Sequence, residues 1–253
     1  MFASLIASTL LPLLALTPTL TLAAPAIPAT LSKRAVGTVR NCNTQGQIAI
    51  TFDDGPFQYD NDLLNTLGDN KATFFVNGQN YGCIYDYADD LKRMSAAGHT
   101  IGSHTWSHKD LTTLSWDQLH DEFYRVEDAM TKILGLKPKY FRPPFGKYND
   151  QVLQVAAQRG YTKMILWSDD TQDASGAPVW QSKQTYDNIN GQSGRIVLNH
   201  NVIPGTVYDV VPHALSVTGS LQKVSIDTCL GSEGEWPYYW VQNPGNRDGS
   251  WTC

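Results

Sequence analysis

The sequence predicts an α/β fold with a parallel β-sheet in a single domain. Short apolar segments alternate with helix-like segments between residues 46 and 228. Several of them are continuously apolar, as expected for parallel strands that are covered on both faces. Seven β-α steps in a domain of this length favour a barrel or a doubly wound sheet. The predicted strands are QIAITF at 47–52, KATFFV at 71–76, HTIGSH at 99–104, KYFRPP at 139–144, TKMILWS at 162–168, RIVLNH at 195–200 and QKVSID at 222–227.

Two of the helical segments carry clear boundaries. The first runs from Ser115, which can form a capping box with Gln118, to Gly135, which ends the helix. The second runs from Asn149 to Gly160 with the same pattern of cap and stop. The apolar residues of the first helix mark one face, as expected for a helix that packs against a sheet. They are Leu119, Phe123, Val126, Met130 and Ile133.

The start of the chain predicts secretion. Residues 1–24 have an apolar centre of the length typical of a secretory signal, and the small residues Ala23 and Ala24 offer a cleavage site. Pro12 and Pro18 interrupt this segment, whereas a membrane anchor needs about 20 uninterrupted apolar residues. We therefore expect a signal peptide at 1–24 rather than an anchor, and a secreted, extracellular protein.

A second processing site is expected at the dibasic pair Lys33-Arg34, which would end a propeptide at 25–34 and leave one domain at 35–253. The net charge of the whole chain is −5, and the loss of these two basic residues would make it more negative. An acidic protein without a basic patch is a poor partner for nucleic acid or anionic lipid. We expect a monomer that binds neither nucleic acid nor membrane.

The four cysteines are an even number in a chain that we expect to be secreted, so two disulfides are predicted. Three connectivities are open. We favour Cys42 with Cys229, which would tie the start of the domain to its end and leave Cys83 to pair with Cys253. The absence of a C-x-x-C pair disfavours a zinc site made of cysteines.

Polar residues follow five of the predicted strands at the point where each strand ends. In barrels and doubly wound sheets, functional residues gather at the carboxyl ends of the strands. These segments would bring acids, histidines and an arginine to one face, which chance placement would scatter. They are TFDD at 51–54, SHTWSH at 103–108, RPPFG at 142–146, WSDDTQD at 167–173 and LNH at 198–200.

His104 and His108 are spaced so that both imidazoles can reach one ion from a helical turn or a tight loop. Catalytic zinc sites usually take three protein ligands and leave one position for water. The pair by itself is a weak signal, because two surface or capping histidines would have the same spacing. Thr105 stands where the H-E-x-x-H motif has its general base, so a protease of that type is disfavoured.

Asp53 and Asp54 increase the weight of the metal hypothesis. Taken alone, Asp-Asp-Gly-Pro suits a turn without function. At the end of a strand, however, one carboxylate can bind a metal ion while its neighbour faces the bound water. In combination with His104, His108 and His200, the two aspartates favour a metal site.

The segments TFDDGP, SHTWSH, RPPFG, DTQDA and IVLNH occur in the order and approximate spacing of five motifs of the polysaccharide deacetylases, carbohydrate esterase family four. The resemblance spans roughly residues 46–220, and five ordered motifs are far more specific than one. Within that family the chain most resembles the secreted chitin deacetylases of fungi. The resemblance implies a distorted (β/α) barrel, here of about seven parallel strands, and a catalytic domain at 35–253.

The resemblance also implies a role for each motif residue. Asp54, His104 and His108 would bind a divalent metal, usually zinc, although another such as cobalt is an alternative. Asp53 would be the general base for a zinc-bound water, and His200 the general acid that protonates the leaving amine.

Four further roles follow from the same resemblance. Asp173 would support the protonated His200, and Arg142 would hold Asp53 ionised. The backbone N–H of Phe145 would stabilise the oxyanion, and Leu198 would contact the acetyl methyl group. An ordinary surface ion pair and a plain core leucine are the alternatives for Arg142 and Leu198.

The chain departs from the family pattern at three positions. Ala174 stands where the fourth motif usually has Trp, so that aromatic wall is missing or is supplied by Trp180. Asn201 replaces a frequent Asp, and Phe145 replaces a common Tyr. The first departure leaves the substrate preference open more than the activity.

We therefore expect a metal-dependent enzyme that removes N-acetyl groups from chitin or its oligomers. An acetylxylan esterase or a peptidoglycan deacetylase with the same fold is one alternative, and a secreted, non-catalytic binder of chitin oligomers is another. The aromatic segment EWPYYWVQNPG at 235–245 could form a glycan platform, but we expect it to pack the end of the chain onto the domain.

Overall fold

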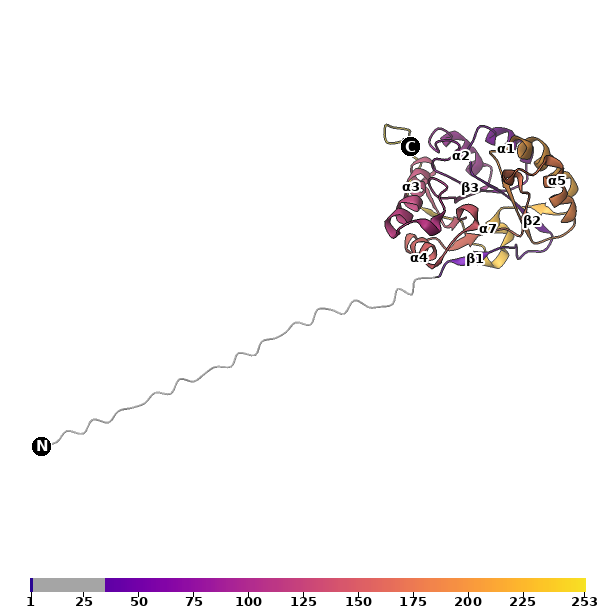
Figure 1. The fold of residues 1–253 in the computed structure, drawn as a ribbon. Coiled ribbons are helices and arrows are strands. Elements are labelled where there is room, and N and C mark those ends of the chain that lie inside the picture. The colour runs from indigo at the N-terminus through magenta and orange to yellow at the C-terminus, as the bar shows by residue number, and fades with distance from the viewer. Residues whose placement is uncertain (2–34) are drawn as a thin grey trace. The chain divides into compact units, whose positions relative to one another are not determined.

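The computed structural model describes Met1 and residues 35–253 (Figure 1). The expected signal peptide, after its first residue, and the expected propeptide at 25–34 lie outside the described residues. Within residues 35–253, no helix has both the length and the apolar character that crossing a membrane requires.

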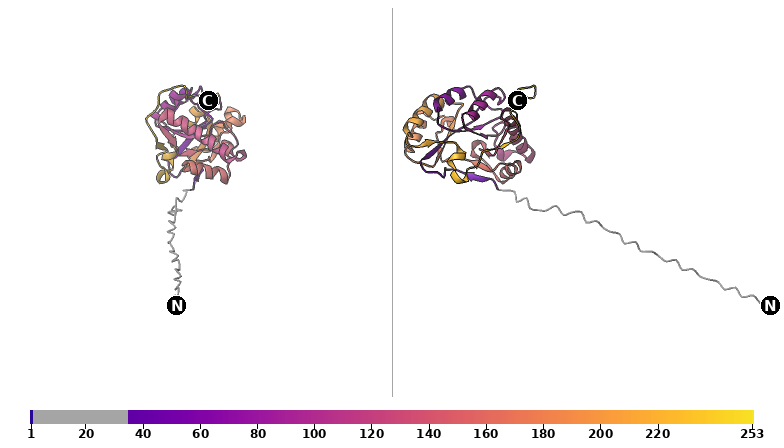
Figure 2. Two further views of the ribbon diagram at one scale, coloured as in Figure 1. Left: turned by 90° about the vertical axis from the view of Figure 1, so that its left-hand side faces the viewer. Right: turned by 180° about the vertical axis from the view of Figure 1, so that it is seen from behind.

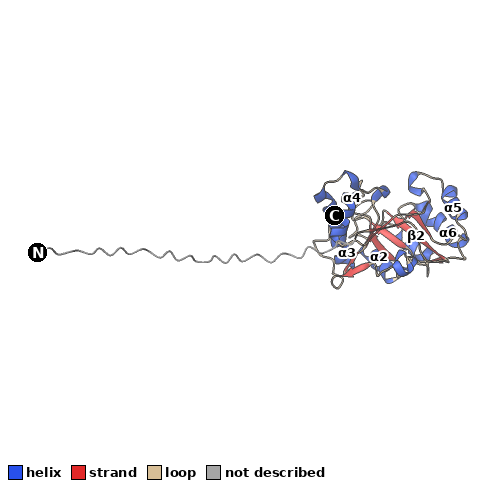
Figure 3. Cartoon of the chain, turned by 90° about the horizontal axis from the view of Figure 1, so that it is seen from below, coloured by secondary structure: helices blue, strands red, loops and turns tan. Residues whose placement is uncertain are grey.

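The main sheet is parallel throughout, with strand order β1-β7-β6-β4-β3-β2-β9-β8 and β10 beside the first residues of β2. It curls into an open barrel with helices around it, which confirms the predicted fold class (Figures 2 and 3). Its strands are β1 (Gly37–Val39), β2 (Gln47–Asp53), β3 (Thr73–Val76), β4 (Thr100–Ser103), β6 (Tyr140–Phe141), β7 (Lys163–Ile165), β8 (Asp169–Asp170), β9 (Arg195–His200) and β10 (Gln222–Lys223).

The number of strands exceeds the predicted seven, because the described part of the sheet has nine. The additional strands, β1 and β8, have only three and two residues, too few to show a periodicity in the sequence. The predicted strand at 222–227 is wrong beyond Lys223, since a short helix, α7 (Ile226–Cys229), begins after Ser225.

Both predicted helix boundaries are confirmed. Ser115 and Gln118 form the capping box of α3 (Trp116–Leu134), and Gly135 ends it in the left-handed conformation. Asn149 caps α4 (Asp150–Arg159) by accepting a hydrogen bond from the N–H of Val152. The remaining helices are α1 (Asp60–Leu67), α2 (Ala88–Ala96), α5 (Val179–Asn188) and α6 (Val211–Val217).

Strand β2 shows how the sheet positions a polar site above an apolar core. Ile48, Ile50 and Phe52 point outward and join the cluster formed with the helices. Ala49 belongs to the cluster inside the barrel, and the alternation of a strand places Thr51 and Asp53 on that same inner side. Asp53 is the last residue of β2, so its carboxylate lies at the carboxyl end of the sheet.

The end of the chain packs onto the domain, as expected. Strand β11 (Tyr238–Trp240) pairs antiparallel with β5 (Leu136–Pro138). Tyr238 is buried and its Oη accepts a hydrogen bond from the N–H of Ile101. Trp236, Tyr239 and Trp240 of the same segment are exposed.

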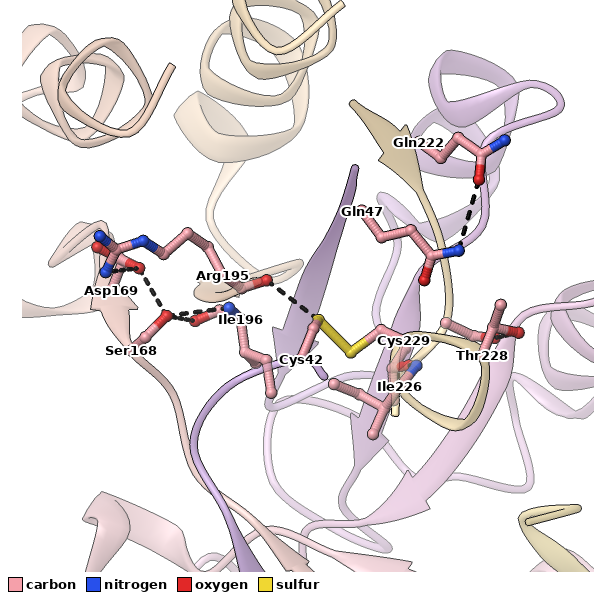
Figure 4. The surroundings of a disulfide bond; sticks show 12 residues. Cys42, Gln47, Ser168, Asp169, Arg195, Ile196, Gln222, Ile226, Thr228 and Cys229 are labelled. Carbon is pink, nitrogen blue, oxygen red and sulfur yellow. Dashed lines mark hydrogen bonds and ion pairs between the residues drawn. A yellow bond between two sulfur atoms is a disulfide. The ribbon is translucent and has the colours of Figure 1, made fainter. Parts of the chain in front are cut away.

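The favoured disulfide pairing is confirmed, because Cys42 is bonded to Cys229 and Cys83 to Cys253. Figure 4 shows the first bond beside Arg195 and Gln47, the first residues of β9 and β2. The N–H of Cys42 also donates to the carbonyl of Gly194. This disulfide therefore fastens the segment after β1 to the amino ends of the strands, opposite the end that carries Asp53.

Candidate metal centre and active site

All five polar segments predicted from the strand ends contribute to one cleft of about 490 Å³ at the carboxyl ends of the strands. The topology brings them together, because parallel strands all present their carboxyl ends at the same edge. The lining residues are Asp53, Asp54, Tyr81, His104, His108, Pro143, Phe145, Trp167, Asp170, Ala174, Ser175, Leu198 and His200.

Asp54, His104 and His108 form a compact group that could hold a metal ion, with one ligand atom from each residue within 4.8 Å of the others. Nε2 of His108 lies 3.1 Å from Oδ1 of Asp54, and Nε2 of His104 lies 3.5 Å from the same oxygen. One carboxylate and two imidazoles are a common ligand set for a catalytic divalent ion.

Two observations show that these residues fit a metal. Oδ1 of Asp54 is buried and accepts no well-formed hydrogen bond from the described residues, although two imidazole nitrogens point toward it. Nδ1 of His104 lies 2.8 Å from the carbonyl oxygen of Arg142, which can only accept, so Nδ1 carries the proton. The lone pair of Nε2 is then directed into the group, the arrangement found in metal-ligating histidines.

The charge states of these residues also suit a metal ligand. Burial lowers the pKa of His104 below 6.5, although Asp53 and Asp54 act in the opposite direction. Burial acts to raise the pKa of Asp54, but the adjacent His108 and the other histidines of the cleft outweigh it and leave this pKa below 3.8. A neutral imidazole and an ionised carboxylate are the forms that bind metal.

Asp53 is held by a buried arginine rather than by the histidines. Nη1 of Arg142 donates to Oδ1 of Asp53 at 2.7 Å and to Oγ1 of Thr51 at 2.8 Å. The other donors of this guanidinium bond the carbonyls of Ile165 and Leu166. Arg142 is fully buried, so the alternative of an ordinary surface ion pair is wrong. It orients Asp53 with its side chain and His104 with its backbone.

His200 and Asp173 form a second pair in the cleft, at the carboxyl end of β9. Nδ1 of His200 donates to Oδ1 of Asp173 at 2.7 Å, and the backbone N–H of His200 donates to Oδ2 at 2.8 Å. Thr206 donates its hydroxyl to the same Oδ2. Burial opposes the charge on His200, but the bond and charge of Asp173 raise the pKa of His200 to about 9. His200 is therefore protonated at neutral pH, with Nε2–H left for the cleft.

The site is built from strained backbone. Among the described residues, five other than glycine have positive φ, and all five belong to the polar segments that contribute to the cleft. Such conformations cost about 1–3 kcal/mol each and persist only where the surroundings hold them. They are Asp54, Thr105, His108, Phe145 and Gln172, the last of which directly precedes Asp173.

One aromatic position differs from expectation. Trp180 is 68% exposed on α5 and is not among the residues that line the cleft. That helix buries Ser182 and Tyr186, so Trp180 lies away from its packed face. Trp167 lines the cleft instead, and Ala174 lines it as well. Phe145 and Leu198 both line the cleft, as the resemblance implied.

Asn201 follows His200 in the chain and is buried against a buried acid. Its Nδ2 donates to Oδ1 of Asp60 at 2.5 Å. Burial raises the pKa of Asp60 to about 7. A second aspartate at position 201 would place two carboxyl groups against each other, so the amide suits this partner.

Sequence reasoning missed several residues that support the site. Thr51 is two positions before Asp53, so strand alternation alone would have placed both on the inner side of β2. Thr206, which bonds Asp173, is not in a strand, so no alternation pattern points to it. Ser107, between the two histidines, donates its N–H to Oε2 of Glu122 on α3 at 2.8 Å, and its hydroxyl to Oε1. A contact between a loop and a distant helix cannot be read from spacing.

Comparison with known proteins agrees with this geometry. Residues 40–164 match the family model described as polysaccharide deacetylase. The chain is 40% identical to a chitin deacetylase from Pestalotiopsis sp, with 78% of this chain and 68% of that protein covered. It is 36% identical to a probable peptidoglycan-N-acetylglucosamine deacetylase from Arthroderma benhamiae, over 76% of this chain and 46% of that protein.

Among solved structures, the chitin deacetylase from Colletotrichum lindemuthianum superposes with a TM-score of 0.77 at 32% identity, covering 83% of this chain and 98% of that one. The chain therefore belongs to the polysaccharide deacetylase family. The resemblance drawn from its five motifs is confirmed.

Proposed function

We propose that this protein is a metal-dependent hydrolase that removes N-acetyl groups from N-acetylglucosamine residues of chitin or chitin oligomers. One observation carries the proposal. The candidate metal group shares its cleft with a carboxylate paired with a buried arginine, Asp53, and a histidine that is protonated at neutral pH, His200. Amide hydrolysis needs both, because water must lose a proton and the leaving amine must gain one.

Zinc, or another divalent ion such as cobalt, would be held by Asp54, His104 and His108 and would supply acidification of water and polarisation of the acetyl carbonyl. Asp53 takes the proton of the attacking water. Its Oδ1 is engaged by Arg142, so Oδ2, 3.7 Å from Nε2 of His104, is the oxygen that remains for this transfer.

The remaining residues handle the charge and the leaving group. The backbone N–H of Phe145 donates to the oxyanion that forms on the acetyl oxygen. Nε2–H of His200 transfers its proton to the amide nitrogen as the C–N bond breaks, giving acetate and a free amine. Leu198 provides the apolar contact for the acetyl methyl group.

The test is acetate release from chitin hexamer by the mature protein, before and after chelation and after zinc or cobalt is added back. We expect release to stop on chelation and to return with metal. In the matched variants, Asp53→Asn should keep the metal and lose turnover, whereas Asp54→Asn should lose the metal. Full activity of Asp53→Asn, or no release from any acetylated glycan, would reject the proposal.

The same assay with a panel of substrates addresses the alternatives. Two observations make another glycan worth testing: one relative is named a probable peptidoglycan-N-acetylglucosamine deacetylase, and the cleft is lined by Ala174 where the family usually has Trp. Release of acetate from acetylxylan or peptidoglycan, but not from chitin oligomers, would show that the substrate is another glycan, and the family assignment would stand. Tight oligomer binding without turnover at any zinc concentration would indicate a binding protein.

We also propose that the protein acts outside the cell as a monomer. Both disulfides are formed, and disulfides persist in oxidising compartments. Detection of a product starting near Ala35 in the culture medium, with a monomeric mass in light scattering, would agree. Retention of the full-length chain inside the cell would contradict it.

A further inference from the structure

A row of four aromatic rings leads out of the cleft. Tyr81 lines the cleft and is 51% exposed. The ring centroid of Tyr81 lies 5.7 Å from that of Phe57, Phe57 lies 5.5 Å from Tyr59, and Tyr59 lies 5.8 Å from Tyr208. Tyr208, at the far end, is again 51% exposed. We call these four residues the aromatic strip.

The aromatic strip joins three loops at the end of the barrel that carries the cleft. Phe57 and Tyr59 lie between β2 and α1, Tyr81 lies in the loop after β3, and Tyr208 lies in the helical turn Thr206–Val210 after β9. The strip is therefore continuous with the active-site cleft through Tyr81.

Packing explains the middle of the strip but not its ends. Tyr59 packs partly against the main core, and Phe57 is half-buried between its neighbours. Tyr81 and Tyr208 leave half of their surface in solvent although both are large apolar rings. An exposed apolar row that begins in a binding cleft indicates a place where a ligand lies.

The side chain of Tyr208 and the loop that carries Tyr81 are each tied to neighbouring structure. Tyr208 donates its hydroxyl to Oδ2 of Asp62 at 2.6 Å. Tyr81 is two residues from Cys83, which is bonded to Cys253 and bridged to Gln79. Fixed rings lose little conformational freedom when a ligand packs on them, so they bind more efficiently than mobile ones.

We infer that the aromatic strip binds the sugar units of a substrate chain that extend beyond the cleft, so that longer chitin oligomers are preferred over short ones. The apolar faces of N-acetylglucosamine rings pack on aromatic rings, and the exposed side chains of Gln58 and Asp62 can bond their hydroxyls. The inference rests on the proposed function, since it takes an N-acetylglucosamine polymer as the ligand.

The test compares kcat/KM for acetate release from chitin hexamer and chitin dimer. In Tyr208→Ala, the ratio of the hexamer value to the dimer value should fall about fivefold, as loss of about 1 kcal/mol of ring contact gives. Tyr208→Phe keeps the ring and should keep the ratio. Trp240→Ala removes another exposed aromatic side chain, on β11 and outside the strip, and should leave both values unchanged.

An unchanged ratio in Tyr208→Ala would overturn the inference, as would an equal loss in Trp240→Ala. Calorimetric titration of the metal-free proteins with chitin hexamer separates this result from the proposed activity. If the wild type binds hexamer without turnover, weaker binding by Tyr208→Ala than by Trp240→Ala still supports the strip. Equal binding by these two variants, or no hexamer binding by the wild type, overturns it.

Discussion

His104 and His200 line the same cleft and are both largely buried, yet they are in opposite protonation states at neutral pH. Nδ1–H of His104 is donated to the carbonyl of Arg142, a neutral group. Nδ1–H of His200 is donated to Asp173, a carboxylate. Burial alone would make both imidazoles neutral. The charge of the partner at Nδ1 therefore decides which histidine can bind a metal and which can donate a proton.

The two sides also depend on different parts of the fold. Arg142, which follows β6, holds both His104 and Asp53. The partners of His200, Asp173 and Thr206, come from the loops after β8 and β9. Each side can therefore be altered while the other stays intact.

The largest effect is expected from His104→Gln. Loss of a residue that only hydrogen-bonds a metal ligand typically lowers metal affinity by about 10- to 100-fold. Loss of one of the three ligands themselves should therefore lower metal affinity by at least about 100-fold, and turnover should be lost with the metal. Metal titration with a competing chelator measures this. His99→Gln is the matched control. His99 is also buried and begins the segment 99–104 that ends at His104, but it does not line the cleft. Comparable metal loss in the control would contradict the assignment of His104.

Asp173→Asn should act on His200 rather than on the metal ligands. Without the carboxylate, His200 loses the bond and charge that raise its pKa, so turnover at pH 7.5 should fall about 100-fold or more while metal affinity changes little. Asp187→Asn is the control, since it removes the carboxylate from another Asp–His pair, with His213, on the surface. Loss of metal in Asp173→Asn would show that the two sides are not separable.

The raised pKa of His200 also predicts how stability depends on pH. The folded pKa, about 9, lies above the ordinary value of 6.5, so the stabilisation is fully present below pH 6.5 and is lost as pH rises through 9. Urea unfolding of the metal-free protein should lose up to about 3 kcal/mol more between pH 6 and pH 9.5 in the wild type than in His200→Gln. Equal losses in the two proteins would contradict a charged His200.

The smallest effect is expected from Glu122→Gln. Glu122 anchors Ser107 in the loop between His104 and His108, so the variant should weaken metal binding about tenfold by loosening His108. Glu127→Gln is a matched control on the same helix, because its buried carboxylate bonds Arg159 and Lys137 instead. The control should lower the free energy of unfolding without changing metal affinity. If both variants lost metal affinity equally, the effect of Glu122→Gln would come from lower stability of the whole domain and not from the loop that carries His108.

Local patterns explain how much of the fold could be predicted. Ser115, Gln118 and Gly135 set the limits of α3 through contacts within a few residues, and such contacts are visible in the sequence. The two-residue strand β8 is too short for that, since its pairing with β9 is between segments distant in the chain. The misplacement of Trp180 has the same cause, because the face that α5 buries is chosen by its neighbours.

The sequence by itself determined which chemical groups reach the cleft, because strand alternation and the ends of parallel strands place Asp53, Asp54 and the histidines at one edge. Only the tertiary structure decided what each group is able to do. The carbonyl that orients His104 is 38 residues away from it, and the carboxylate that charges His200 is 27 residues away. Hydrogen bonds and burial over such separations set the protonation states, and these depend on the folded arrangement rather than on local sequence.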